Sequence, residues 1–238
     1  MPQFLLFILL FFSQTLFAEI KIPVNLSQLD RLETLRILGM GTSSKILSEP
    51  YPLGGYSGLE LGVSIEFLDL TDLSSLGATI PDKQENTTYP KLSLGKGLYN
   101  NIDMFFNFTP YSKNSGLSQY GGMIRWGFYQ SPYVPTCLSL LVHGNATNVS
   151  QNIFSQSFGV DLVAGFTLNY VSVYFGGGQI ESRGQFVGIN SSNNIETEHT
   201  SSVHTLMGTI LTLDKVFVAI ELDRYSDAMI SAKIGIRN

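Results

Sequence analysis

Three histidines in the second half of the chain are the side chains best suited to acid–base or nucleophilic chemistry. His143, His199 and His204 fall near predicted external loops. The polar groups beside the last two are Ser201, Ser202, Glu196 and Glu198. A hydrolase site requires such groups to converge in space, and sequence spacing alone does not show convergence. We therefore assign no catalytic residue and no enzyme class, and keep a membrane-embedded hydrolase with a His-based site near the external rim as an alternative.

A second set of polar side chains alternates with apolar ones along predicted strands. These are Glu60, Glu66, Asp103, Arg125, His143, Asp161, Glu221, Asp223, Lys233 and Arg237. We expect all ten to line the lumen of a barrel. An isolated charge in a narrow lumen is costly, so opposite charges should pair across it, with Arg125 bridging to Asp103 or Asp161. A structural ionic network is the first interpretation. A polar path with a mild cation preference is the second, because six acids face three fixed cations.

The elements that would position these side chains follow a period of two from Tyr56 onward. The clearest alternation lies at 59–67, 102–108, 216–223 and 230–236. Weaker versions lie at 89–98, 117–129, 136–144, 153–165, 169–180 and 202–213. Most of these ten predicted strands are about ten residues long. That is the length of a tilted membrane-spanning strand, about 9–11 residues, whereas strands of globular proteins are usually about five or six.

The connections between the predicted strands alternate in length. The long or polar ones are 68–88, 110–116, 145–152, 181–201 and 224–227, and the tight ones are 99–101, 130–135, 166–168 and 214–215. Short periplasmic turns alternating with longer external loops are typical of outer-membrane barrels. The sequence therefore predicts an all-β fold, an antiparallel transmembrane β-barrel of about ten strands. A soluble β-sandwich with a Phe-rich core is the second interpretation.

Aromatic residues near the predicted strand ends resemble two interfacial girdles. Those near the tight turns are Tyr99, Phe128, Tyr133, Phe166 and Tyr170, and those near the long loops are Phe108, Tyr111, Tyr120 and Phe154. Lys96 shares its parity with the lipid-facing leucines of its strand. It can reach the interface beside the turn at Asn100, or the glycines around it can mark a register-flipping bulge.

The N-terminal part of the chain, residues 1–55, differs from this pattern. Residues 1–18 read as a signal peptide, because a nine-residue apolar run precedes Ala18 and is too short to span a bilayer. We expect 19–55 to form a periplasmic helix and connector, and 56–238 to form the barrel. Leucines recur every third residue between 26 and 38, which predicts a short amphipathic helix. This helix could block the lumen or lie on the inner surface of the membrane.

Composition narrows the function classes. Charged residues make up 14% of the 238-residue chain, Gly numbers 23, and the net charge is −5. This balance excludes a disordered chain and argues against nucleic acid as a partner. The single cysteine, Cys137, forms no internal disulfide, and the Cys/His spacing predicts no metal site and no cofactor.

Several segments resemble a poorly characterised group of Gram-negative outer-membrane β-barrel proteins. Residues 94–103 (LGKGLYNNID) are similar to a strand–turn–strand motif of the group, and residues 120–126, 159–162 and 231–237 are similar to its later strands. The chain departs from the group at Tyr99, where proline is usual, and ends in Asn238 rather than in an aromatic residue. The resemblance implies an outer-membrane location, with lipid and the barrel assembly machinery as partners. It implies no particular activity.

We therefore expect a structural or narrow polar channel-forming barrel, whose solute or external ligand the sequence does not identify. A channel for small hydrophobic substrates is a further alternative. It would need a lateral opening, for which the three glycines at 176–178 are the candidate place, because glycine weakens local strand packing.

Overall fold

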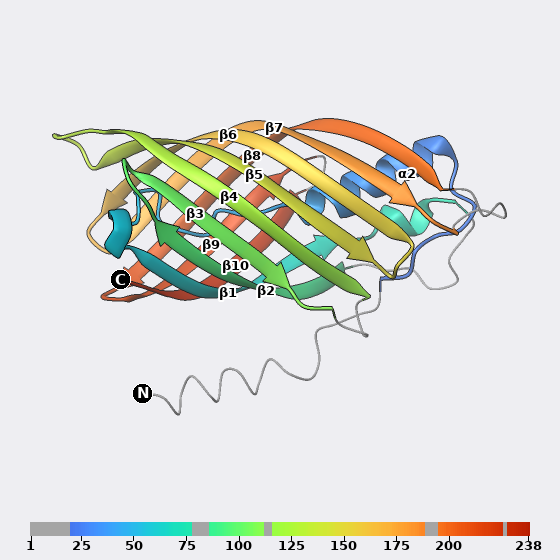
Figure 1. The fold of residues 1–238 in the computed structure, drawn as a ribbon, viewed down its shortest axis with the longest axis horizontal. Coiled ribbons are helices and arrows are strands. Elements are labelled where there is room, and N and C mark those ends of the chain that lie inside the picture. The colour runs from blue at the N-terminus through green and yellow to red at the C-terminus, as the bar shows by residue number, and fades with distance from the viewer. Residues whose placement is uncertain (1–19, 78–85, 112–115, 189–194, 226–227) are drawn as a thin grey trace, which may run out of the picture.

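The computed structural model describes residues 20–77, 86–111, 116–188, 195–225 and 228–238, so the expected signal peptide lies outside the described residues. Ten antiparallel strands form a closed barrel, as predicted (Figure 1). They are β1 Leu59–Asp69, β2 Asn86–Gly97, β3 Ile102–Thr109, β4 Leu117–Gln130, β5 Thr136–Val149, β6 Ile153–Leu168, β7 Val171–Phe186, β8 Glu196–Leu213, β9 Val216–Arg224 and β10 Ala228–Arg237. Within these ranges no helix is long and apolar enough to cross a membrane.

Each strand pairs with its neighbours in sequence, and β1 closes the barrel by pairing with β10 from Glu60↔Arg237 to Phe67↔Ile230. Because side chains of a strand alternate between its two faces, one set points outward and the other into the lumen. In β1, Leu61 is 43% exposed, whereas its neighbour Glu60 is 1% exposed. The outer surface of the barrel is therefore apolar, whereas its interior holds the charged side chains together with buried apolar ones.

The strands at the long-loop end extend further than the sequence predicts. The expected loops at 145–152 and 181–201 are mostly strand, since β5 continues to Val149, β7 to Phe186, and β8 begins at Glu196. The connection after β5 is a tight turn with positive φ at Ser150 and Gln151. The strict alternation of long and short connections was therefore wrong. The polar composition of these stretches suggested loops. In the structure they are strands, and their inward-facing polar side chains bind groups inside the barrel rather than water.

Lys96 lies at the short-turn end of β2, where its ammonium group donates a hydrogen bond to the carbonyl of Tyr56. The pairing of β1 with β2 is continuous from Leu59↔Lys96 to Asp69↔Asn86, so no bulge reverses the register there. Of the two interpretations offered for this lysine, the first is therefore the one that the structure supports.

A short helix lies inside the barrel at the long-loop end (Figure 1). α2 (Gln28–Thr34) begins at a capping box, in which the Ser27 hydroxyl accepts the Asp30 N–H and the Asp30 carboxylate accepts the Ser27 N–H. It continues directly as the π-helix η1 (Leu35–Met40). Leucines of this helix pack against inward-facing apolar side chains of the barrel wall, which removes them from water.

The rest of the N-terminal segment runs through the lumen toward the short turns and ends in a 3₁₀ turn, η2 (Gly55–Ser57), just before β1. We call residues 20–58 the plug. The expectation of a periplasmic helix and connector over 19–55 is corrected here, because the plug occupies the interior of the barrel. The physical reason is that the inward-facing polar side chains need partners, and the plug supplies them.

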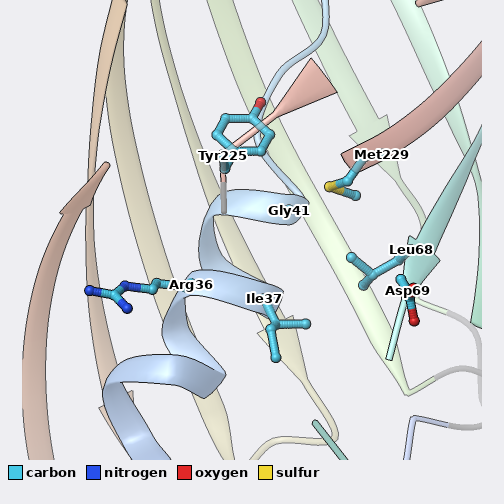
Figure 2. A pocket seen from close by; sticks show the side chains of 7 residues that line it. All are labelled: Arg36, Ile37, Gly41, Leu68, Asp69, Tyr225 and Met229. Atoms are coloured by element: carbon cyan, nitrogen blue, oxygen red, sulfur yellow. The ribbon is translucent and has the colours of Figure 1, made fainter. Parts of the chain in front are cut away.

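The plug packs closely against the wall at the long-loop end. A cavity of about 10 Å³ separates the helix from β1 and β10, and the space for a single water molecule is of this size. Figure 2 shows Ile37 and Gly41 of the plug facing Leu68 of β1 and Met229 of β10, with Tyr225 above the end of the helix.

Gly165 of β6 tests how closely the plug packs against the wall near the short turns. A Cβ at this position would overlap the ring of Pro50 in the plug, and a proline ring has little freedom to move away. We expect Gly165→Ala to lower the free energy of unfolding by about 1–3 kcal/mol through overpacking. Urea unfolding in detergent micelles measures this change. Gly122→Ala is the control, because its Cβ would lie 3.4 Å from the nearest atom, and an equal loss there would contradict the explanation.

Candidate functional site

The plug is held near the short turns by Arg125. The guanidinium donates to the Asp103 carboxylate at 3.0 Å and 2.8 Å and to the backbone carbonyl oxygens of Glu49 and Tyr51. The other Asp103 oxygen accepts the Leu53 N–H at 3.0 Å. Arg125 and Asp103 are both at most 1% exposed. This wall pair therefore binds the plug backbone at three residues while neutralising its own charge.

Glu221 of β9 holds the middle of the plug. Its two carboxylate oxygens accept the N–H groups of Ile46 and Leu47 at 3.1 Å and 3.0 Å, and Tyr174 donates a further hydrogen bond from its hydroxyl. A carboxylate with three donors satisfies polar groups that would otherwise be buried without partners. Glu221 thus fixes the position of the plug along the barrel axis.

Two lysines complete the charge balance of the lumen. Lys91 of β2 pairs with Glu66 at 2.5 Å and donates to the plug carbonyl of Ser43 at 3.3 Å. Lys45 of the plug donates to the Tyr225 hydroxyl at 3.0 Å and lies 3.8 Å from Asp223. Burying such charges is tolerable only when they are paired and hydrogen-bonded.

Further contacts hold the plug to β1, β5, β8 and β10. The Ser48 hydroxyl donates to Glu60, which also binds Lys233 at 2.8 Å. The Thr42 hydroxyl lies 2.8 Å from that of Thr147.

At the long-loop end Arg31 of α2 binds Glu196 and Glu198 of β8, both at 2.8 Å. At the opposite end Glu49 accepts from Arg237 at 2.6 Å. The plug is therefore bound to the wall at intervals from Arg31 to Leu53.

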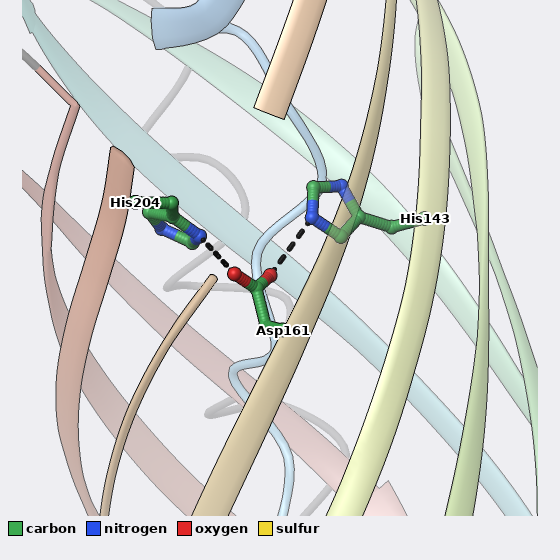
Figure 3. A group of neighbouring side chains, drawn as sticks. All are labelled: His143, Asp161 and His204. Atoms are coloured by element: carbon green, nitrogen blue, oxygen red, sulfur yellow. Dashed lines mark hydrogen bonds and ion pairs between the residues drawn. The ribbon is translucent and has the colours of Figure 1, made fainter. Parts of the chain in front are cut away.

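A chain of alternating histidines and carboxylates lies in the lumen at mid-height (Figure 3). His143 Nε2 is 2.9 Å from one oxygen of Asp161, and His204 Nδ1 is 2.9 Å from the other. His204 Nε2 is in turn 2.9 Å from Asp223 Oδ1. All four residues are at most 3% exposed. Their strands, β5, β6, β8 and β9, bring together residues 18 and 43 positions apart in sequence.

The structure places the ten side chains expected in the lumen as follows. Nine are buried inside the barrel, and Arg237 is half-buried at the short-turn end. Arg125 pairs with Asp103 and not with Asp161, which binds the two histidines instead.

Sequence reasoning missed the lumen positions of Lys91 and His204, and the contribution of Lys45. The alternation of β2 could have located Lys91, because it shares the parity of Tyr89, which donates to Glu66 at 2.6 Å. No comparable pattern exists for Lys45, whose position depends on how the plug threads the barrel. With these cations included, the expected excess of acids over cations in the lumen is largely removed.

The rim site required for a hydrolase is not assembled. His204 lies in the lumen, whereas the side chain of His199 is 54% exposed on the outer face, 3.6 Å from Glu181. Glu196 and Glu198 bind Arg31. His143 and His204 meet at Asp161 inside the lumen, but His199 does not join them, because it lies five positions before His204 on β8 and its side chain points to the opposite face.

The lateral opening required for a hydrophobic-substrate channel is not present at the three glycines. β7 pairs with β6 and with β8 without interruption through residues 176–178. A Cβ at Gly176 would meet the carbonyl oxygen of Leu162 first, and one at Gly178 that of Val160, so these two glycines allow β6 and β7 to lie close together.

No protein-family model matches this sequence, and no curated protein matches it either. Solved β-barrel structures do. The N-terminal β-barrel domain of Pseudomonas aeruginosa OprF matches with a TM-score of 0.41 at 10% identity, covering 77% of this chain and 99% of that one. Ail of Yersinia pestis, in complex with sucrose octasulfate, matches with a TM-score of 0.32 at 15% identity, covering 76% and 96%. Omp33 of Acinetobacter baumannii matches with a TM-score of 0.33 at 9% identity, covering 79% and 98%.

At identities of 9–15%, these likenesses concern the β-barrel fold alone. The fold and the lumen together define this chain as a closed ten-stranded β-barrel with an apolar outer surface and an interior filled by its own N-terminal segment.

Proposed function

We propose that this protein is a β-barrel of the Gram-negative outer membrane that its own plug keeps closed, and that it serves as a structural element rather than as an open channel. The observation that carries this proposal is the continuous series of bonds between the plug and the inward-facing side chains of the wall. The membrane location and the closed state have separate support.

The outer surface supports contact with lipid. Apolar side chains such as Val63, Leu162 and Ile220 are exposed around the barrel, although water would disfavour a surface of this extent. At the short-turn end Tyr99 and Tyr170 are exposed beside the turns, as expected for an interfacial girdle. Lipid is therefore the expected partner of this surface, and the assembly machinery for barrels is the expected partner during insertion.

The lumen supports the closed state. A path for ions would have to pass the plug, whose backbone is hydrogen-bonded to Asp103 of β3 and to Glu221 of β9. Opening such a path would leave buried carboxylates and N–H groups without partners, at about 1–3 kcal/mol for each group. The cation preference expected from sequence also loses its basis, because Lys45 and Lys91 pair with the acids.

Bilayer recordings test this proposal directly. The full-length protein, purified in detergent and inserted into planar bilayers, should show no stable conductance steps at neutral pH. A difference in gel migration before and after boiling would establish in the same sample that the barrel is folded. Regular conductance steps from folded protein would contradict the closed state, and identical migration before and after boiling would contradict the barrel itself.

A further inference from the structure

Three residues of the lumen present suitably placed ligand atoms for a metal ion. One ring nitrogen of His143, one of His204 and a carboxylate oxygen of Asp161 all lie within 4.8 Å of one another, and all three residues are buried. Figure 3 shows the two imidazole rings on either side of the Asp161 carboxylate, each turning a nitrogen toward it. These residues come from β5, β6 and β8, so the cluster joins three strands of the wall.

The three ligand residues are paired with glycines on the neighbouring strands. His143 is paired with Gly159, and Asp161 and His204 are both paired with Gly178. A Cβ at Gly159 would overlap the ring of His143 at Nε2, and one at Gly178 would lie 2.6 Å from Asp161 Oδ1. Glycine at 159 therefore leaves room for the His143 ring, whereas a Cβ at Gly178 would first meet the backbone oxygen of Val160.

The surroundings orient His204 as metal-binding histidines are usually oriented. Its Nε2 is 2.9 Å from Asp223 Oδ1, and a carboxylate on the far nitrogen fixes the ring and raises its basicity toward a metal. Tyr225 stacks on the same ring at a centroid distance of 4.3 Å and an interplanar angle of 5°. His143 Nδ1 has no hydrogen-bond partner among the described residues.

We propose that His143, Asp161 and His204 bind one divalent transition-metal ion of the zinc type inside the barrel. The ligand atoms would be His143 Nε2, one Asp161 oxygen and His204 Nδ1, with a fourth position left for water. Tetrahedral zinc with bonds of about 2.0–2.1 Å places its ligand atoms about 3.3 Å apart. Each histidine nitrogen now lies 2.9 Å from a different Asp161 oxygen, so one pair is within a few tenths of an ångström of this spacing and the other histidine would have to move toward the shared oxygen.

The donor set selects the kind of ion. Two imidazole nitrogens and one carboxylate suit Zn²⁺, Co²⁺, Ni²⁺ or Cu²⁺, whereas Mg²⁺ and Ca²⁺ prefer oxygen ligands. Binding would displace the protons now shared between Asp161 and the two histidines. Lys45 lies 3.8 Å from Asp223, so that carboxylate has a countercharge of its own.

The test is to refold the full-length protein in detergent with Co²⁺ present, since the plug restricts later entry, and to remove loosely bound ion. The folded wild type should retain one Co²⁺ per chain, with the visible absorption of a tetrahedral site. His204→Gln should abolish retention. His199→Gln is the matched control and should retain one ion, because His199 is on the outer face. Asp223→Asn keeps all three ligand residues but removes the carboxylate that orients His204 and pairs with Lys45, and it should weaken binding by about 10–100-fold.

A second measurement keeps the proposal falsifiable if a lumen variant does not fold. Wild-type protein loaded with Cu²⁺ should give an electron paramagnetic resonance spectrum with coupling to two imidazole nitrogens. Folded wild type that retains no stoichiometric metal would overturn the proposal. So would a spectrum without nitrogen coupling, or equal retention by folded His204→Gln and wild type.

Discussion

Replacing Arg125 by methionine should destabilise the folded barrel by about 3–5 kcal/mol, the cost of breaking a buried ion pair from one side. The substitution leaves the Asp103 carboxylate buried without its countercharge and removes the donor to the carbonyl oxygens of Glu49 and Tyr51. Methionine keeps most of the side-chain volume, so the loss reports the polar contacts. The measurement is urea unfolding of the full-length protein in micelles. The folded fraction at each urea concentration is read from the difference in gel migration before and after boiling.

Two further variants separate this explanation from a general effect of losing an arginine. Arg183 of β7 is exposed on the outer face, so Arg183→Met should change the free energy of unfolding by less than about 0.5 kcal/mol. Adding Asp103→Leu to Arg125→Met should recover part of the loss, because the unpaired charge is removed. A double variant less stable than Arg125→Met alone would contradict the role assigned to this pair.

Replacing Glu221 by leucine should loosen the plug and open a conducting path. The N–H groups of Ile46 and Leu47 and the Tyr174 hydroxyl would all lose their acceptor. At about 1–3 kcal/mol for each buried unsatisfied group, the plugged state would lose about 3 kcal/mol or more. Conductance events absent from the wild type should then appear in planar bilayers, and the free energy of unfolding should fall.

Glu181→Leu is the matched control for this second prediction, because Glu181 is exposed on the outer face of β7. It should leave the bilayers silent, as in the wild type. Glu221→Gln, which keeps one acceptor oxygen, should give an intermediate loss of stability. If folded Glu221→Leu shows no conductance events, the remaining contacts of the plug, such as those of Arg125 and Arg31, hold it in place without Glu221.

Local pattern was sufficient for the strands and for which way their side chains point. In β1, β9 and β10 the alternation is strict, so a residue's parity alone assigned Glu60, Glu221 and Lys233 to the lumen. The alternation did not locate strand ends where the inner face is polar and the outer face has few large apolar residues. The extension of β5 to Val149 and of β7 to Phe186 was missed for this reason.

The plug was only half predictable. A leucine-rich helix with a capping residue is a local feature, and the sequence indicated it over 25–38, close to α2 and η1 together. Its place inside the barrel depends on contacts with residues far away, such as that between Arg31 and Glu198, 167 positions apart. Spacing along the chain carries no information about such pairs.

The sequence by itself determined a closed antiparallel barrel of ten strands, its apolar exterior and the inward direction of its charges, because strand parity is set residue by residue. Only the tertiary structure decided that the lumen is filled, that Arg125 binds Asp103, and that Asp161 lies between two histidines. Closing the barrel gives every inward-facing residue neighbours from other strands and from the plug. Which of these neighbours meet is set by register and by the threading of the chain, and both exist only in the assembled fold.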